Sequence, residues 1–281
     1  MKGILNVNKP ASWTSFDVVN YLKKFLNIKH IGHLGTLDPM ATGVLPVTLG
    51  SATKLFDLFL SKVKTYIAKF EFGYNTDTLD ATGEIIEKTD KTPTIEEIQA
   101  ILPKFLGEIQ QVPPIYSAKK INGRKAYNIA RSGETIELKP NTIFIKNLEI
   151  LDFKDNILTM KIECGAGTYI RAIGRDIASE LNTLATMTEL TRTEVGIFKL
   201  EDSVNIKDLT KEELIEKILP TDITFNHLSI IDDETIVFRL LNGQTVITDL
   251  PDGEYRVYKE NEFVALASCN SNKLKMTKYF G

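Results

Sequence analysis

Glycine and proline are concentrated in residues 32–50, whose sequence is GHLGTLDPMATGVLPVTLG. Four glycines in nineteen residues suit a backbone that turns tightly or lets a ligand approach closely. Asp38 is the only acidic residue of the segment, and Pro39 after it disfavours helical geometry at Asp38. The sequence therefore predicts a carboxylate on a constrained loop, anchored by the apolar run at residues 44–49. Asp-Pro is also common in surface turns, so the pair alone leaves an ordinary turn open.

The length and composition are those of an ordinary globular protein. The chain has 281 residues, of which 43% are hydrophobic and 25% charged, and this length predicts one large domain with an appendage. No apolar run is long enough to span a membrane, and the N-terminal run is too short for a signal peptide. The two cysteines, Cys164 and Cys269, exclude a disulfide framework and a four-cysteine metal site. We therefore expect a cytoplasmic protein without a membrane partner.

Positive charge is concentrated in two parts of a chain whose net charge is −3. Residues 1–70 contain nine lysines and three acidic residues, so they carry +6 and the remainder carries −9. Residues 116–133 contain no acidic residue and five basic ones: Lys119, Lys120, Arg124, Lys125 and Arg131. Phosphate binding depends on local positive surface, so both parts are candidates for nucleic-acid contact. Lysines alone favour an ordinary solvated surface over a nucleic-acid contact.

Hydrophobic periodicity predicts helices mixed with long strands. A helix is expected over residues 15–27 with Ser15 as its cap, and Thr94 and Glu97 form a capping-box pair for a second helix over 94–105, whose last turn Pro103 should disturb. Alternation predicts a strand over 65–72. Further helices are expected over 125–132 and 169–181, and paired strands over 142–153 and 157–164. This irregular order favours an α+β fold over a regular βαβ array.

The composition changes after about residue 198. Residues 201–281 contain fifteen acidic and nine basic residues. A charged helix is predicted over 209–219, and β-rich runs are predicted after Phe225, at residues 236–240, 244–248, 255–258, 263–267 and 274–280. We therefore expect two domains, residues 1–225 and 226–281, the second being a small β-barrel or an added sheet layer.

A series of motifs extends over residues 3–198. They are ILNVNKP at 4–10, the segment at 32–50, KTY at 64–66, TDTLDATG at 76–83, VPPIYSAKKINGRKAYNIAR at 112–131, GTYIR at 167–171 and LTRTEVGIF at 190–198. Together and in this order they resemble the motifs of the TruB family, the bacterial tRNA pseudouridine-55 synthases. Leu34 stands where the family usually has threonine, and Lys119 replaces a usual leucine. Neither departure touches Asp38 or the glycines around it.

The resemblance implies a fold and a reaction. The fold is a mixed, mainly antiparallel sheet of pseudouridine synthase type, followed by a small C-terminal β-barrel of the PUA type. The reaction is the isomerisation of uridine to pseudouridine in the T-loop of tRNA, in which the base leaves C1′ through nitrogen and rejoins through carbon. It needs no redox partner and no group donor, so we expect no cofactor and no metal. The expected partner is the T-arm of tRNA, bound by a monomer.

The resemblance also implies roles for three residues of the reaction centre. Asp38 matches the catalytic carboxylate, and carboxylates are ionised at neutral pH. It would attack C1′, attack the uracil or assist glycal formation. Arg171 matches the cation that keeps this carboxylate ionised and oriented. Tyr66 matches the aromatic residue that stacks on the flipped uracil and helps to move a proton, and such stacking returns roughly 1–3 kcal/mol per base.

Other residues are expected to support the site or to bind RNA. His33 matches a histidine that packs beside the target nucleotide, and acid–base catalysis by it stays open. Lys9 is expected to position the Asp38 loop, and Tyr169 of GTYIR to support the active site. The RNA-binding candidates are Lys119, Lys120, Arg124, Lys125 and Arg131.

Three alternative functions are left open by the residues themselves. A glycosidase or nucleosidase would also use an aspartate near C1′, but it normally has a second carboxylate as acid, whereas the motifs pair Asp38 with Arg171. A non-catalytic RNA-binding protein would not need Asp38, Tyr66 and Arg171 together. Metal-dependent hydrolysis is the weakest alternative, because His30 and His33 lack a convincing further set of ligands.

Overall fold

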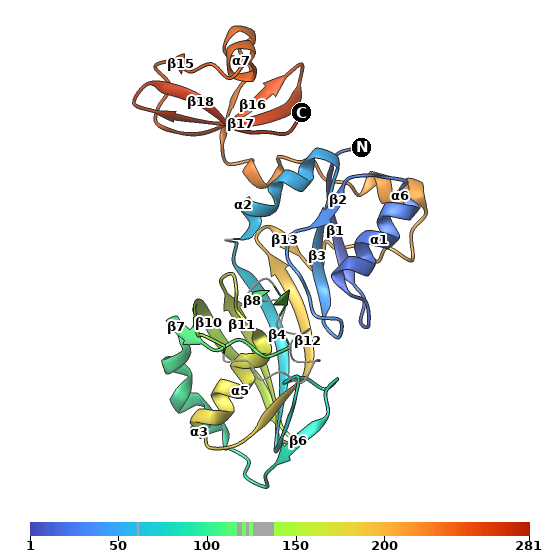
Figure 1. Cartoon of the computed structure of the whole chain (residues 1–281), viewed down its shortest axis with the longest axis vertical. Coiled ribbons are helices and arrows are strands. Elements are labelled where there is room, and N and C mark those ends of the chain that lie inside the picture. Colours follow the sequence, from blue (N-terminus) through green and yellow to red (C-terminus); the bar gives the residue numbers. More distant parts are fainter. Residues whose placement is uncertain (61, 117–119, 122–123, 126–137) are drawn as a thin grey trace.

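The computed structural model describes residues 1–60, 62–116, 120–121, 124–125 and 138–281. A nine-stranded sheet forms the main body, and a five-stranded sheet lies at one end of the molecule (Figure 1). The strands are β1 (Gly3–Lys9), β2 (Ile31–His33), β3 (Thr42–Leu49), β4 (Lys64–Phe72), β5 (Tyr74–Thr76), β6 (Ile85–Lys88), β7 (Gly107–Gln111), β8 (Lys120–Ile121), β9 (Arg124–Lys125), β10 (Asn141–Lys154), β11 (Ile157–Cys164), β12 (Ala185–Val195), β13 (Phe198–Lys199), β14 (Ser229–Ile231), β15 (Val246–Ile247), β16 (Gly253–Lys259), β17 (Glu262–Asn270) and β18 (Lys273–Tyr279). The helices are α1 (Ser15–Phe25), α2 (Phe56–Leu60), α3 (Ile95–Ile101), α5 (Ile170–Glu180), α6 (Lys211–Glu216), α7 (Glu234–Leu241) and the short 3-10 helices η1 (Gly50–Leu55), η2 (Leu102–Phe105) and η3 (Ile223–Phe225). The predicted α+β class is confirmed.

The main sheet has the order β1-β3-β12-β4-β11-β10-β7, with β2 pairing β3 and β13 pairing β12. Its pairings are antiparallel except that of β12 with β3, so the expected mixed, mainly antiparallel sheet is confirmed. β12 therefore joins two halves of the sheet: it pairs with β4 along most of its length and meets β3 only at residues 191 and 192. The site described below lies at this junction.

Close packing brings α5 against the middle of the sheet. Ile170, Ile173 and Ile177 of the helix are buried in the main core, as their helical spacing predicts. A Cβ on Gly174 would lie 2.3 Å from the ring of Phe70 on β4, so only glycine permits this approach. The helix therefore starts at a fixed position beside β4, and Arg171 lies in its first turn.

The C-terminal sheet has the order β14-β16-β17-β18-β15 and curls into a half-barrel beside α7 (Figure 1). One hydrophobic cluster joins it to the main body, because Phe263 and Phe280 of the C-terminal part share a core with Val44 and Leu55. Polar contacts also cross this boundary between the C-terminal sheet and the main body, the seam of the molecule. Lys2 pairs with Glu262 at 2.9 Å, and Lys54 Nζ donates to the carbonyl of residue 279 at 3.0 Å. The two parts are therefore packed together by side chains on both sides of the seam.

Most predicted elements are present, with corrections at their ends. The strands over 65–72, 142–153 and 157–164 are confirmed, as is the capping box that begins α3. Helix α1 is capped by Thr14 instead of Ser15, because Thr14 and Asp17 exchange capping-box hydrogen bonds. The charged helix predicted over 209–219 is shorter, since α6 covers only Lys211–Glu216.

One predicted strand is wrong, and one predicted helix lies outside the described residues. Residues 236–240 belong to helix α7, where Asp233 caps the first turn by accepting a hydrogen bond from the N–H of Ile236 at 2.9 Å. Val237 and Leu240 are buried three residues apart while Phe238 is exposed, which is a helical pattern. The helix expected over 125–132 falls almost wholly on residues that the structure does not describe.

Candidate active site

Asp38 lies in an irregular segment between β2 and β3, which several buried groups hold by its backbone. Ser15 Oγ accepts from the N–H of Leu37 at 2.8 Å and donates to its carbonyl at 3.2 Å. Arg192 donates to the carbonyls of Gly35 and Thr36 at 3.0 and 3.3 Å. Backbone groups on the N-terminal side of Asp38 are therefore fixed, while 36% of its own side chain is exposed.

Lys9 holds the other side of the same loop. Its Nζ donates to the carbonyl of Pro39 at 3.1 Å and to those of Pro10 and Trp13 at 2.8 and 2.6 Å. The side chain is entirely buried, and burial lowers the pKa of Lys9 to about 8, although the nearby Asp38 carboxylate opposes that shift. This geometry fits the predicted positioning role and removes Lys9 from the lysines that could contact RNA phosphates.

Arg192 lies in a row of residues that crosses the sheet beneath the loop. In the strand register, Lys9 on β1 is opposite Gly43 on β3, Gly43 is opposite Arg192 on β12, and Arg192 is opposite Tyr66 on β4. Gly43 has a φ of +102°, and a Cβ there would lie 2.2 Å from the Arg192 carbonyl. Glycine is therefore required where β3 and β12 meet, and this close approach brings the loop over Arg192.

Arg171 pairs with Asp38 from the first turn of α5. Its Nε lies 2.9 Å from Asp38 Oδ2, and its Nη1 lies 3.4 Å from Oδ2 of the buried Asp80. The guanidinium also donates to the carbonyls of Thr78 at 2.8 Å and Tyr116 at 3.1 Å, and only 7% of the side chain is exposed. These contacts hold the Arg171 guanidinium in one orientation between two carboxylates. Of the two, only Asp38 is exposed enough to meet a ligand.

Gln111 fixes the start of the helix that carries Arg171. Its side-chain oxygen accepts from the N–H of Tyr169 at 2.9 Å, and its Nε2 donates to the carbonyl of Tyr169 at 3.2 Å. Tyr169 is the cap residue of α5 and makes no side-chain cap of its own. Tyr169 therefore holds the start of α5 through its backbone N–H and carbonyl.

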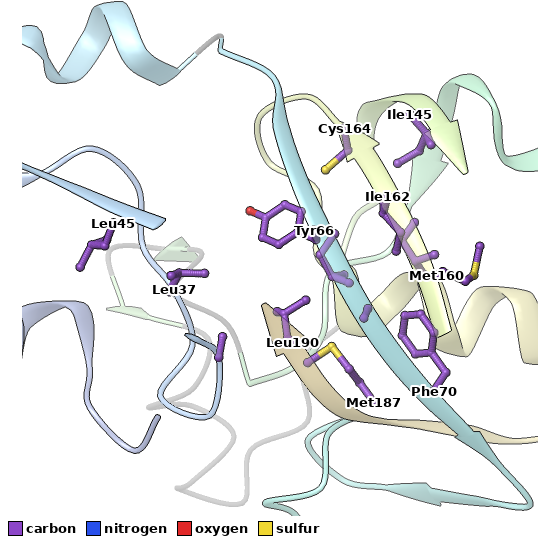
Figure 2. Close-up of a cluster of buried hydrophobic side chains, with 14 of the residues drawn as sticks. Leu37, Leu45, Tyr66, Phe70, Ile145, Met160, Ile162, Cys164, Met187 and Leu190 are labelled. Carbon is purple, nitrogen blue, oxygen red and sulfur yellow. The ribbon is translucent and has the colours of Figure 1, made fainter. Parts of the chain in front are cut away.

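Tyr66 lies on β4 at the junction of the two sheet halves. Figure 2 shows its hydroxyl pointing away from the core around Met160 and toward the segment that carries Leu37. The ring is almost completely buried, and burial raises the pKa of Tyr66 while the nearby Arg192 guanidinium opposes that shift. The phenol is therefore protonated at neutral pH, with a cation beside it.

His33 ends β2 on the approach to the loop. Burial lowers the pKa of His33, and the positive charge of Arg192 lowers it further. The imidazole is therefore neutral at neutral pH, which suits packing and hydrogen bonding better than proton donation.

The predicted RNA-binding residues lie in the least described part of the chain. Lys119 and Arg131 are outside the described residues. Lys120 belongs to β8, and Arg124 and Lys125 form β9, which pairs with β8 as a two-stranded ribbon. Their role in RNA binding stays a prediction.

Four residues of the site were not singled out from the sequence: Ser15 as a loop contact, Asp80, Gln111 and Arg192. Arg192 carries a usable signal, because it shares a strand face with the apolar Leu190, and an inward arginine needs a partner. Asp80 lies in the motif TDTLDATG, but its contact with Arg171 could be recognised only once the fold was known. Ser15 and Gln111 give no signal, since each acts on a backbone segment at least 22 residues away.

The described ranges contain neither a membrane-spanning helix nor a cluster of metal-binding side chains. No helix there is long and apolar enough to cross a membrane. No group of three or more histidine, cysteine or acidic side chains gathers there in a way that could hold a metal ion. The expectation of a reaction without metal or cofactor stays a prediction.

Solved structures of similar fold support the architecture. A chain in a Cbf5-Nop10-Gar1 complex matches with a TM-score of 0.74 and 25% identity, covering 99% of this chain and 85% of its own. A chain in an H/ACA RNP bound to a substrate RNA containing 2'-deoxyuridine matches with a TM-score of 0.72 and 25% identity, covering 99% and 85%. The likeness spans both sheets, so it includes the C-terminal part.

Sequence relatives match over almost their whole length. Proteins named tRNA pseudouridine synthase B are 39% identical in Clostridium tetani, covering 99% of both chains, and 41% identical in Fusobacterium nucleatum, covering 100% of both. Residues 23–170 match the model described as TruB family pseudouridylate synthase, N-terminal domain, and this range contains Asp38 and Tyr66. The chain therefore belongs to the TruB family of pseudouridylate synthases and is an isomerase.

Proposed function

We propose that the chain converts uridine 55 of tRNA to pseudouridine, that it recognises the T-arm, and that Asp38 is the catalytic carboxylate. The observation that carries the proposal is a partly exposed carboxylate, 2.9 Å from a buried guanidinium, on a loop held by its backbone. The names of the curated relatives support tRNA as the substrate.

The reaction rearranges bonds within one nucleotide. The bond from C1′ to N1 breaks, the base turns, and a bond from C1′ to C5 forms. C5 loses its proton and N1 gains one, so the composition of the nucleotide does not change. A carboxylate can serve as nucleophile at C1′ or as base in a glycal route. Asp38 has the exposure that both routes require, and Arg171 keeps it oriented.

Tyr66 and His33 would complete the pocket for the flipped base. The Tyr66 ring offers a flat apolar surface with a polar tip, which suits stacking on a uracil. Extruding a base costs a few kcal/mol, and stacking returns a comparable amount. A loop target therefore fits this pocket better than a paired base.

The remaining assignments follow from the substrate. We assign residues 1–225 to catalysis and 226–281 to a PUA-like unit that contributes to RNA binding. We further assign the protein to the cytoplasm, where it would meet tRNA, and expect it to act as a monomer. All the site residues described above lie before residue 193, which supports this division.

Direct mapping of pseudouridine tests the reaction. Purified protein is incubated with an unmodified tRNA transcript and with an isolated T-arm hairpin, and pseudouridine is located by chemical modification and primer extension. We expect one product at position 55 in both RNAs and none when that uridine is replaced by cytidine. Release of free uracil would instead indicate a nucleosidase, and binding without any product would indicate a non-catalytic RNA-binding protein.

Salt dependence tests the RNA contacts separately. With roughly four to six phosphate contacts, log affinity should fall against log salt with a slope of about −3 to −5. Replacing Lys119, Lys120, Arg124 and Lys125 together by alanine should make the slope shallower. An unchanged slope would show that this basic stretch does not lie along the RNA.

A further inference from the structure

Arg192 is a buried arginine that uses all its nitrogens on backbone carbonyls. Its Nε donates to the carbonyl of Val44 at 2.7 Å, Nη2 to that of Gly35 at 3.0 Å and Nη1 to that of Thr36 at 3.3 Å. The side chain is 1% exposed, and no carboxylate pairs with it among the described residues. Burying a cation without a counter-ion is costly, so this arrangement needs the three carbonyls together.

The three carbonyls belong to two different segments. Val44 lies on β3, while Gly35 and Thr36 lie in the loop two and three residues before Asp38. One guanidinium therefore fastens the loop to the strand that follows it, from a residue about 150 positions later in the chain. Ser15 and Lys9 hold the next backbone groups, at Leu37 and Pro39, from other elements.

Arg192 also lies beside Tyr66, the second functional residue of the site. It is the cross-strand partner of Tyr66, and its charge acts on the Tyr66 hydroxyl and on His33. The same guanidinium therefore sets the backbone beneath Asp38 and lies beside the ring expected to stack on the base.

We propose that Arg192 is a positioning residue for pseudouridine formation, which fixes the Asp38 loop against the sheet through the carbonyls of Gly35, Thr36 and Val44. The inference rests on the proposed function and adds a residue that does not touch the RNA. A lysine cannot replace it, because one ammonium at the end of a flexible chain cannot match the planar fork that reaches all three oxygens. A positive charge at position 192 is thus not sufficient to hold the Asp38 loop.

Single-turnover kinetics of Arg192→Lys and Arg192→Gln, at saturating enzyme, test the proposal. A misplacement of about 1 Å can cost roughly 100-fold in rate, so we expect Arg192→Lys to slow the step about 10- to 100-fold and Arg192→Gln to slow it further. Affinity for the T-arm hairpin should change little, because Arg192 is buried. The matched control is Arg256→Lys, which alters a largely buried arginine at the seam and should leave the rate of folded protein unchanged.

Hydrogen exchange gives a measure that does not depend on activity. Amides of residues 34–41 should exchange faster in both Arg192 variants but not in Arg256→Lys. Ser15→Ala loosens the same loop from another side with less risk to folding. Its effect on the rate should be non-additive with that of Arg192→Lys, because both changes release one segment.

The outcomes separate the inference from the function on which it rests. An inactive wild-type protein would contradict the proposed function, while loop exchange would still decide whether Arg192 fastens the loop. Normal turnover in folded Arg192→Lys, or loop exchange unchanged in both variants, would overturn the positioning role. Loss of affinity with an unchanged chemical step would overturn it as well and make Arg192 a determinant of RNA binding.

Discussion

Two regions of the described structure hold buried or largely buried cations and neutralise them differently. At the seam between the two sheets, Arg256 Nη1 lies 3.0 Å from Asp222 Oδ2, and the Tyr258 hydroxyl donates to the same carboxylate. Around Asp38, Lys9 and Arg192 donate to backbone carbonyls and have no paired carboxylate among the described residues, and Arg171 is shared by Asp38 and Asp80. The Arg256 pair is therefore balanced charge for charge, whereas the described residues around Asp38 include more buried cations than carboxylates.

This difference separates a structural network from a reactive one. A buried pair that is matched and hydrogen-bonded serves to join two elements. Cations placed around a partly exposed carboxylate hold that carboxylate in one orientation for a substrate. Charge changes around Asp38 should therefore affect the chemical step, and those at the seam should affect stability.

Asp38→Asn should produce the largest effect. Loss of an essential catalytic carboxylate should lower the single-turnover rate by about 10³-fold or more, as found when members of a catalytic group are removed. The amide has nearly the same size, so the unfolding midpoint and T-arm affinity should stay near those of the wild type. A folded Asp38→Asn protein with near-normal turnover would remove the basis for treating the surroundings of Asp38 as the reactive region.

Arg171→Ala should lower both turnover and stability. Removing an oriented cation beside the reacting group should cost about 10²- to 10³-fold in rate. It also leaves Asp80 buried without its cation, which should destabilise the fold.

The double variant Arg171→Ala with Asp80→Asn sharpens this test. We expect it to recover much of the stability, since no uncompensated buried carboxylate remains at Asp80, but none of the rate. Thermal unfolding and single-turnover kinetics measure the two quantities. Recovery of the rate along with stability would mean that Arg171 serves only the fold.

Asp222→Asn at the seam should change stability alone. Breaking a buried ion pair from one side costs about 3 kcal/mol in the free energy of unfolding, because Arg256 loses its counter-ion. The single-turnover rate of the folded protein should be unchanged. The control Asp232→Asn removes an exposed carboxylate of the same part of the chain and should have little effect on either quantity. A large loss of rate in Asp222→Asn would show that a change at the seam reaches the active site.

The sequence predicted the residues around Asp38 better than the seam, for a physical reason. Asp38, Tyr66 and Arg171 lie in short motifs that carry the family resemblance, and strand alternation predicted only the strand β4. The inward position of Arg192 could have been read from its strand face, but its partners are carbonyls about 150 residues earlier, which no local pattern encodes.

The C-terminal part shows the same limit at the level of secondary structure. Helix α7 was predicted as a strand because Ile236, Val237 and Phe238 form a β-branched and aromatic run. The structure instead shows a helix, which is capped by Asp233 and buries Val237 and Leu240 on one face. Shared apolar packing across the seam likewise joins residues too distant in sequence to be paired by pattern.

The pH dependence of Lys9 should give the smallest effect, and its sign can be worked out. Burial lowers the pKa of Lys9 from 10.5 to about 8, and Asp38 and Asp17 partly oppose this shift while Arg192 adds to it. Between pH 8 and 10.5 the unfolded chain binds more protons than the folded one, so the stability contributed by this group rises with pH.

The rate should move in the opposite direction, because a neutral amine has two N–H groups for three carbonyls and its hold on Pro39 weakens. Loss of one hydrogen bond corresponds to a fall of roughly 2- to 10-fold as the pH rises through about 8. Lys9→Met should be slower at neutral pH and should lack this fall, as single-turnover rates between pH 7 and about 9 would measure. The same decline in Lys9→Met would assign it to another group, and Lys9 would then be a structural cation like Arg256.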